Sequence, residues 1–299
     1  MSTYNGEKFL SQQLDSLYNQ SGVNIHILVR DDGSSDSTLE ILKKYSKSKG
    51  NIEVISGKNI GAAKSFFEIS HYAQFSLPEY DYYAFCDQDD IWLSDKLISA
   101  INSLEQFDNN KLYFCRAKYV DSNLNYLRES PKVKVFDYTT CVYRNPALGC
   151  TMVFDKSLLD TFCLAYQKID EIYNLHDAWM FKCAIYTNAS IISDNDIHIL
   201  YRQHGSNVTT ANKGTIKKYQ SALSRRFKRK HFYSKNTKVF LEIYMPFIDD
   251  EKKRMFLSYT ANYQTSIFNT LRFLQKQRWK TEGVLDKALW ALLVIFRMF

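Results

Sequence analysis

Short apolar runs alternate with helix-like stretches along the first 200 residues of the chain. The apolar runs are rich in β-branched or aromatic residues, as buried strands are, and the stretches between them carry apolar residues at helical spacing. This alternation predicts an α/β architecture with a mostly parallel sheet. The predicted strands are 25–29, 52–55 and 80–86, and the predicted helices are one that begins at Ser37 and two over 61–75 and 94–107.

Local signals refine two places in this pattern. Ser37 fits the N-cap of the first of these helices, with Glu40 three residues later as its capping-box partner. Leu39 and Leu42 are expected to form the buried stripe of that helix. Residues 1–6 have the character of a loop that follows a strand, so the first strand of the sheet is expected to be absent or truncated.

Charge divides the chain into two parts. The net charge is +7, but residues 213–299 hold 19 Lys and Arg against 6 Asp and Glu, which gives +13. Residues 1–212 hold the remaining 20 basic and 26 acidic residues, which gives −6. We therefore expect a catalytic domain over 1–212 and a basic, aromatic-rich helical region over 213–299 with an anionic partner.

The end of this basic region indicates what that partner is. Residues 217–231 interleave basic and aromatic residues, and residues 288–299 are nearly all apolar. The apolar run is shorter than the about 20 residues that span a bilayer, so it predicts an interfacial helix on a membrane surface. Two other interpretations stay open at this point, a helical dimerisation element and a nucleic-acid-binding surface. We favour the membrane and expect no nucleic acid.

The cysteines bear on the cellular compartment. They form no CxxC pair and follow no signal peptide, so free thiols in a reducing compartment are expected, on the cytoplasmic side of the plasma membrane. The six are Cys86, Cys115, Cys141, Cys150, Cys163 and Cys183.

The strongest chemical signal is the acidic triplet Asp87–Gln88–Asp89, directly after the third predicted strand. In extended chain, residues two apart project to the same side, so Asp87 and Asp89 are expected to converge on one ion. Paired carboxylates at a strand end suit a hard divalent cation such as Mg²⁺ or Mn²⁺, which binds diphosphate oxygens. A solvated surface loop is the alternative, but carboxylates beside a buried strand are costly without a partner.

A second acidic pair, Asp31–Asp32, follows the first predicted strand. A carboxylate there can accept hydrogen bonds from a pyrimidine N–H or from ribose hydroxyls, and Gly33 permits a tight turn. Because the carboxyl ends of parallel strands meet at one edge of a sheet, both acidic groups are expected to line one cleft.

These motifs resemble those of the family 2 glycosyltransferases with the GT-A fold. The resemblance covers residues 1 to about 210 and rests on several motifs in the same order. Residues 176–179 and 201–207 are further similar to the bacterial rhamnosyltransferase branch of that family. The motifs are Thr3–Glu7, Asp31–Asp36, Asn59–Gly61, Asp87–Asp90, Gly149–Met152, His176–Trp179 and Tyr201–Asn207.

The resemblance implies a role for individual residues. Asp89 is expected as the main metal ligand, with Asp87 on ribose or metal and His204 as a further ligand. Asp177 takes the position of the catalytic base. The residues implied to bind the nucleotide-sugar donor are Thr3, Tyr4, Glu7, Asp31, Asp32, Lys64, Asp87 and Arg202.

The resemblance also implies the reaction, a single displacement that inverts the anomeric carbon. The donor is expected to be dTDP-rhamnose or else a UDP-hexose, and the acceptor a glycan or lipid-linked hydroxyl in surface or capsular polysaccharide synthesis. Trp92, His176 and Trp179 lie beside acidic motifs and are candidates for contacting the acceptor sugar, with core packing as the alternative. Two other functions are possible alternatives, that of a sugar nucleotidyltransferase and that of a catalytically inactive scaffold.

Overall fold

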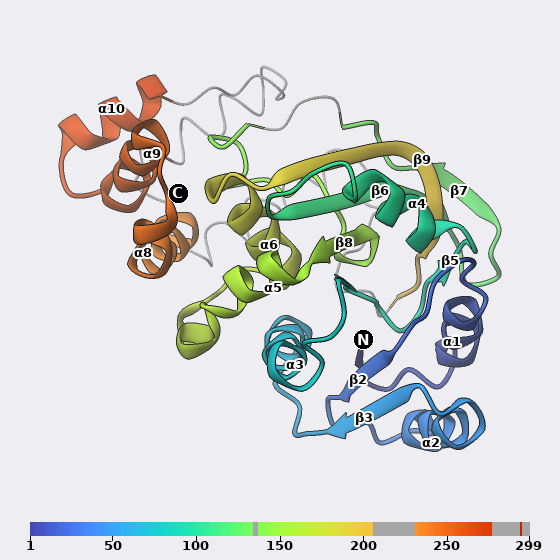
Figure 1. Ribbon diagram of the computed structural model, residues 1–299. Coiled ribbons are helices and arrows are strands. Elements are labelled where there is room, and N and C mark those ends of the chain that lie inside the picture. Colours follow the sequence, from blue (N-terminus) through green and yellow to red (C-terminus); the bar gives the residue numbers. More distant parts are fainter. Residues whose placement is uncertain (134–136, 206–230, 277–293, 295–299) are drawn as a thin grey trace.

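The computed structural model describes residues 1–133, 137–205, 231–276 and 294. Two sheets lie side by side, with helices packed around them (Figure 1). The basic runs at 217–218 and 225–230 and most of the apolar end at 288–299 lie outside the described residues, so the expectations placed on them stay predictions.

The first sheet is parallel, as the alternation of apolar runs predicts. Its strand order is β1–β2–β3, and β2 pairs along its whole length with β3, from Ile27 opposite Ile52 to Asp31 opposite Ser56. The elements that build it are β1 (Ser2–Thr3), α1 (Leu10–Tyr18), β2 (Ile27–Asp31), α2 (Thr38–Lys49), β3 (Ile52–Ser56) and α3 (Ala62–Ser76).

A short first strand is present. β1 has two residues, which pair in parallel with Arg30 and Asp31 at the end of β2. Ser37 is the N-cap residue of α2, as predicted, but its side chain makes no cap hydrogen bond; instead Asp36 Oδ1 accepts a hydrogen bond from the Thr38 N–H at 3.0 Å. The prediction that Leu39 is buried is wrong. Leu39 is 38% exposed, because Leu42 alone of the two faces the sheet.

The second sheet is mixed, which the sequence pattern did not predict. Its path is β4–β8–β6–β9–β5, with β7 paired to β6. β6 and β9 are parallel, and the other pairs are antiparallel. The elements are β4 (Tyr82–Ala84), β5 (Ile91–Trp92), α4 (Lys96–Leu104), β6 (Lys111–Val120), β7 (Tyr126–Glu129), η1 (Gly149–Thr151), β8 (Met152–Asp155), α5 (Lys156–Cys163), η2 (Tyr166–Glu171), α6 (His176–Tyr186) and β9 (Ser190–Arg202).

The C-terminal helices pack against the α5–α6 side of the catalytic region (Figure 1). Trp179 of α6 meets Phe240 of α8 at 5.4 Å between ring centroids, and its Nε1–H donates to the Tyr244 hydroxyl at 3.3 Å. The described part of this region therefore shares the core of the catalytic region. Its elements are α8 (Phe232–Tyr244), η3 (Met245–Phe247), α9 (Glu251–Asn262) and α10 (Ile267–Lys276).

Candidate active site

The acidic turn after β4 carries three carboxylates close together. Asp87 and Asp89 are half-buried and Asp90 is fully buried. Asp90 Oδ1 accepts a hydrogen bond from the Arg202 N–H at 3.0 Å, whereas Oδ2 has no hydrogen-bond partner among the described residues. A buried carboxylate oxygen without a hydrogen-bond partner destabilises the folded state, so a positive charge bound at this turn would stabilise it.

The pKa values of Asp87 and Asp90 are raised because the carboxylates are buried and lie close to one another. Burial, together with the neighbouring charges of Asp89 and Asp177, raises the pKa of Asp87 to about 7. Burial, with Asp89 and Asp87 nearby, also holds the pKa of Asp90 well above its usual range. Carboxylates that repel one another in this way are readily stabilised as anions by a divalent cation.

Cys150 is a member of this cluster that the sequence reasoning missed. Ligand atoms of Asp87, Asp90 and Cys150 all lie within 4.8 Å of one another. The group does not include Asp89. In the sequence Cys150 belongs to the motif Gly149–Met152, but nothing there placed it at the acidic turn, because it stands on η1, sixty residues after Asp90.

Asp89 is instead joined to His204. His204 Nε2 lies 2.6 Å from Asp89 Oδ2, and the histidine ring packs at 5.0 Å between centroids from Phe9. The structure thus brings together two residues that are 115 positions apart in the chain and that were both expected at the metal. Histidine and carboxylate side chains are both common metal ligands in proteins.

Arg202 makes contacts that the sequence did not predict. Its side chain is only 1% exposed, and its Nε–H donates to the Asp89 carbonyl at 2.8 Å. The guanidinium also donates to the Ser122 carbonyl at 2.9 Å and to Gln12 Oε1 at 2.7 Å. These hydrogen bonds let Arg202 position the acidic turn, and its expected contact with the diphosphate stays a prediction.

The pair Asp31–Asp32 is also engaged by the protein. Asp31 accepts hydrogen bonds from the Thr3 hydroxyl at 3.0 Å and from the Ser34 N–H at 2.9 Å. Asp32 is 2% exposed, pairs with Arg30 and accepts the Gly61 N–H at 2.8 Å. These contacts tie β2 to β1 and to the start of α3.

The loop that follows β1 is bound to the acidic turn through Gln88. The Gln88 side chain accepts the Tyr4 N–H at 2.9 Å and donates to the Tyr4 carbonyl at 3.1 Å. The Tyr4 side chain itself is 48% exposed, which leaves it available to a ligand. Glu7 accepts the Ser37 N–H at 3.0 Å, and Lys64 forms an ion pair with Asp170 at 2.5 Å.

Asp177 lies in the first turn of α6, close to the acidic turn. Burial raises its pKa to about 6, while hydrogen bonds from the main-chain N–H groups of Ala178 and Gly149 oppose the rise. A Cβ on Gly149 would come within 3.3 Å of the Asp177 Cβ and 2.7 Å of His176 Nε2. Glycine is therefore needed here, and the carboxylate has the pKa of a group that can take up a proton near neutrality.

The three aromatic candidates for acceptor contact are core residues, so that expectation is corrected. Trp179 is completely buried between α6 and α8. Trp92 is 5% exposed and covers the ammonium of Lys96 at 3.2 Å from its ring centroid. His176 stacks on Phe66 at 3.8 Å between centroids, and burial lowers its pKa to about 3. These large planar side chains fill the interior because the burial of their apolar surface is favourable.

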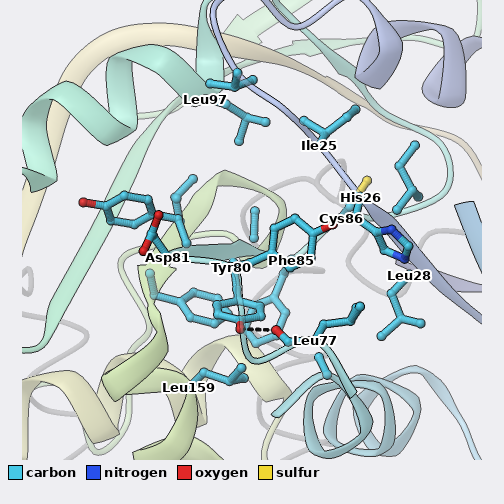
Figure 2. Close-up of a pocket in the computed structure, with 18 of the residues that line it drawn as sticks. Ile25, His26, Leu28, Leu77, Tyr80, Asp81, Phe85, Cys86, Leu97 and Leu159 are labelled. Carbon is cyan, nitrogen blue, oxygen red and sulfur yellow. Dashed lines mark hydrogen bonds between the residues drawn. The ribbon is translucent and has the colours of Figure 1, made fainter. Parts of the chain in front are cut away.

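A cavity of about 480 Å³ lies between β2 and β4, with Cys86 and Trp92 among its lining residues (Figure 2). Its walls are mainly apolar, and none of Asp89, Asp177 and His204 lines it. This cavity is therefore not the donor site.

Comparisons with known proteins agree with the geometry. The family model of glycosyl transferase family 2 matches residues 1–161. The chain is 33% identical to dTDP-rhamnosyl transferase RfbG of Shigella flexneri over 228 residues, which are 74% of this chain and 77% of that protein. It is 28% identical, over 66% of this chain and 70% of that one, to the Escherichia coli UDP-Glc:alpha-D-GlcNAc-diphosphoundecaprenol beta-1,3-glucosyltransferase WfgD.

Among solved structures, S. aureus TarS 1–349 in complex with UDP-GlcNAc superposes with a TM-score of 0.57 at 20% identity. The match covers 93% of this chain and 75% of TarS 1–349, and it supports the GT-A fold. No helix in the described part of the chain is long and apolar enough to cross a membrane. The chain belongs to glycosyl transferase family 2, in its rhamnosyltransferase-like branch, and is a nucleotide-sugar-dependent glycosyltransferase.

Proposed function

We propose that the protein transfers rhamnose from dTDP-rhamnose, with inversion, to a hydroxyl of a glycan or lipid-linked acceptor. The observation that carries the chemistry is the position of Asp177, a carboxylate with a pKa raised to about 6, within electrostatic reach of the acidic turn at Asp87. The donor assignment is supported by the 33% identity to a dTDP-rhamnosyl transferase. A UDP-hexose is the second candidate donor, because WfgD is by name a UDP-Glc-dependent enzyme.

A divalent cation, Mg²⁺ or Mn²⁺, fits the acidic turn. The supporting observations are the unpartnered Oδ2 of buried Asp90 and the mutual repulsion of Asp87, Asp89 and Asp177. Asp89, Asp87 and His204 would hold the ion, with Asp90 behind them. When bound, the cation neutralises the negative charge that develops on the leaving nucleotide diphosphate.

Asp177 acts as the general base in this proposal. Its carboxylate takes the proton of the acceptor hydroxyl while the hydroxyl oxygen forms a bond to the anomeric carbon of the donor. The bond from that carbon to the diphosphate oxygen breaks on the opposite face, so the nucleoside diphosphate leaves with the electron pair. Holding donor and acceptor in line supplies much of the rate.

Tyr4 and Glu7 are proposed to bind the nucleoside. They lie on the loop that Gln88 joins to the acidic turn, and both are exposed. Thr3, Asp31 and Asp32 are buried, so their proposed part is to shape this wall of the nucleoside site. Lys64 would reach the diphosphate by exchanging its exposed partner Asp170 for phosphate oxygens.

We further propose that the enzyme works at the membrane surface, where a lipid-linked acceptor is found. α10 presents exposed apolar side chains at Ile267 (59%), Phe268 (73%) and Leu271 (50%) on a helix that also carries the exposed Arg272. An amphipathic helix with apolar and basic residues is suited to an anionic lipid surface. Self-association through the same face, as a homodimer, is the rival proposal.

A panel of nucleotide sugars tests the proposed function. dTDP-rhamnose, UDP-glucose, UDP-GlcNAc and GDP-mannose are compared for thermal stabilisation and for slow donor hydrolysis, with Mn²⁺ and with EDTA. We expect the largest response from dTDP-rhamnose, because a ligand at 100 times its Kd adds about 2.7 kcal/mol of stability. We also expect EDTA to abolish hydrolysis. A larger response to a UDP-sugar would reject the donor, and full hydrolysis in EDTA would reject the metal.

A further inference from the structure

A second group of potential metal ligands lies on β9, apart from the acidic turn. Ligand atoms of Asp194, Asp196 and His198 all lie within 4.8 Å of one another. His198 is only 6% exposed, whereas Asp194 is half-buried and Asp196 is exposed. His198 precedes Arg202 by four positions, which corresponds to about 13 Å along a strand. This group is therefore separate from the carboxylates of the candidate active site.

An irregularity in the pairing of β6 with β9 brings these side chains together. β9 pairs with β6 up to Ser193 and again from Ile197, and the partners on β6 are Phe114 and Arg116. Residues 194–196 therefore stand where β6 has a single residue, which makes a bulge in β9. Bulges redirect side chains, and this one places two carboxylates beside a buried imidazole.

The surroundings of the His198 ring indicate a positive charge at this place. Its Nδ1 lies 3.0 Å from Asp95 Oδ1, and its Nε2 lies 3.3 Å from Asp194 Oδ2. Neither ring nitrogen forms a hydrogen bond of normal geometry with a described residue. A neutral imidazole carries one proton, so at least one of its nitrogens turns a lone pair toward a carboxylate oxygen. Two acceptors that face each other are stabilised only by a cation between them or by a second proton on the ring.

The distance between the two atoms favours the cation over the second proton. Zn²⁺ binds histidine nitrogen at about 2.0–2.1 Å and carboxylate oxygen at about 2.0–2.2 Å, in tetrahedral geometry. Two such ligand atoms lie about 3.4 Å apart. A direct hydrogen bond from a charged nitrogen to a carboxylate is shorter, at about 2.7–2.9 Å. The 3.3 Å between His198 Nε2 and Asp194 Oδ2 therefore fits two ligands of one zinc ion better than a direct hydrogen bond.

We propose that this site binds Zn²⁺ through His198 Nε2 and the carboxylates of Asp194 and Asp196, with water completing the coordination. The imidazole among the ligands favours zinc over Mg²⁺, which prefers oxygen ligands alone. In the zinc-bound form the exposed carboxylate of Asp95 turns to accept the Nδ1–H, which fixes the tautomer that presents Nε2 to the metal. The Tyr113 hydroxyl donates to Asp194 Oδ2 at 2.6 Å and holds that carboxylate in place.

The role of this metal is structural. Asp95 immediately precedes α4, and the main-chain N–H of Leu93 donates to the His198 carbonyl at 3.0 Å. A zinc ion on the bulge therefore ties β9 to the start of α4. The same strand leads to Arg202 and His204, which contact the acidic turn. The metal thus stabilises the strand that positions these two residues, without itself contacting the donor.

The test measures Zn²⁺ binding to the full chain by calorimetry and equilibrium dialysis, after a chelator has removed all metal. Asp196→Asn and Asp95→Asn change exposed side chains, so both variants are expected to fold, and Asp249→Asn is the matched control. Co²⁺ then replaces Zn²⁺ for absorption spectra. Because Cys150 belongs to the acidic cluster, an ion bound there gives a sulfur-to-metal charge-transfer band, whereas the proposed ligands on β9 are nitrogen and oxygen.

We expect Asp196→Asn to weaken the Kd for one Zn²⁺ by about 100-fold and Asp95→Asn to weaken it by about 10–100-fold, with no change in Asp249→Asn. Zn²⁺ at 100 times this Kd should raise the Tm of the original chain by about 5–10 °C more than that of Asp196→Asn. The cobalt absorption that Asp196→Asn loses should lack the sulfur band.

Two results would overturn the proposal. If the original chain, Asp196→Asn and Asp95→Asn bind Zn²⁺ with equal stoichiometry and Kd, His198 is instead doubly protonated between its carboxylates. If Asp196→Asn loses the sulfur band, the ion concerned is bound at the acidic turn and not on β9. Neither readout depends on the donor or on turnover, so both are distinct from tests of the proposed glycosyl transfer.

Discussion

Arg202 holds the Asp89 main chain from the end of β9. Its Nε–H donates to the Asp89 carbonyl at 2.8 Å, and its own main-chain N–H donates to the side chain of the next residue, Asp90, at 3.0 Å. One arginine therefore fixes both the backbone and a carboxylate of the acidic turn. Since His204 follows two residues later and contacts Asp89, the end of β9 and the acidic turn form one unit.

The first prediction concerns this unit. Arg202→Lys keeps the positive charge but loses the planar set of donors that reaches Asp89, Ser122 and Gln12 together. We expect the free energy of unfolding to fall by about 3 kcal/mol and the apparent affinity for Mn²⁺ to weaken. Arg128→Lys is the control, because Arg128 is an exposed arginine that stacks on Tyr119. Unchanged metal affinity in Arg202→Lys would show that the turn does not depend on the guanidinium.

Asp177→Asn tests the proposed base. The amide cannot accept the acceptor proton, so kcat is expected to fall by about 10²–10⁴-fold while the Kd for the nucleotide sugar stays near its original value. Asp249→Asn, which changes an exposed carboxylate, should leave both constants unchanged. Steady-state kinetics with equilibrium donor binding separates the two effects, and near-normal turnover in the Asp177 variant would remove it from the mechanism.

The pH dependence of kcat follows from the same carboxylate. Because burial raises the pKa of Asp177 to about 6, the base is protonated and inactive below that pH and ionised above it. We expect log kcat to rise with unit slope toward pH 6 and to level off above it, at saturating donor and metal. A profile of kcat without an inflection near pH 6 would argue against Asp177 as the titrating base.

His176 is expected to make the protein sensitive to acid. Burial lowers its pKa from 6.5 to about 3, so the unfolded state takes up a proton first as the pH falls below 6.5. Between pH 6.5 and pH 3, the free energy of unfolding is expected to fall by about 1.4 kcal/mol for each pH unit. His176→Gln should flatten the decline in unfolding free energy below pH 6.5, measured by urea titration, whereas His26→Gln, at a partly exposed site, should not. Parallel declines in both variants would place the acid sensitivity elsewhere.

Liposome flotation tests the proposed membrane surface. Replacing Ile267, Phe268 and Leu271 by Ser removes the exposed apolar face of α10 and leaves its buried residue Phe273 in place. We expect the triple variant to lose most of its binding to vesicles containing phosphatidylglycerol, and the original chain to bind less at high salt. Flotation equal to that of the original chain would exclude this face. If the original chain is a dimer, the triple variant is a monomer and both float equally, the result would favour the homodimer proposal over the membrane surface.

Much of the fold was predictable because it depends on local patterns. The apolar strand before Asp31 and the helix after Gly61 were both expected within a few residues of their observed bounds. Gly33 adopts a φ of 82°, as the expected tight turn requires. The antiparallel strands β7 and β8 were not predicted, because their pairing with β6 joins segments whose register no local signal specifies.

The sequence by itself determined the family, the order of the acidic motifs and their positions after strands, because each depends on residues that are close in the chain. Only the tertiary structure decided which carboxylates crowd together and which are occupied by protein donors. Cys150 joins Asp87 and Asp90, while Arg202 donates to the Asp89 carbonyl and Trp179 lies in the core. These outcomes depend on burial and on hydrogen bonds between distant segments, and a buried polar group takes whichever partner the packed chain brings within reach.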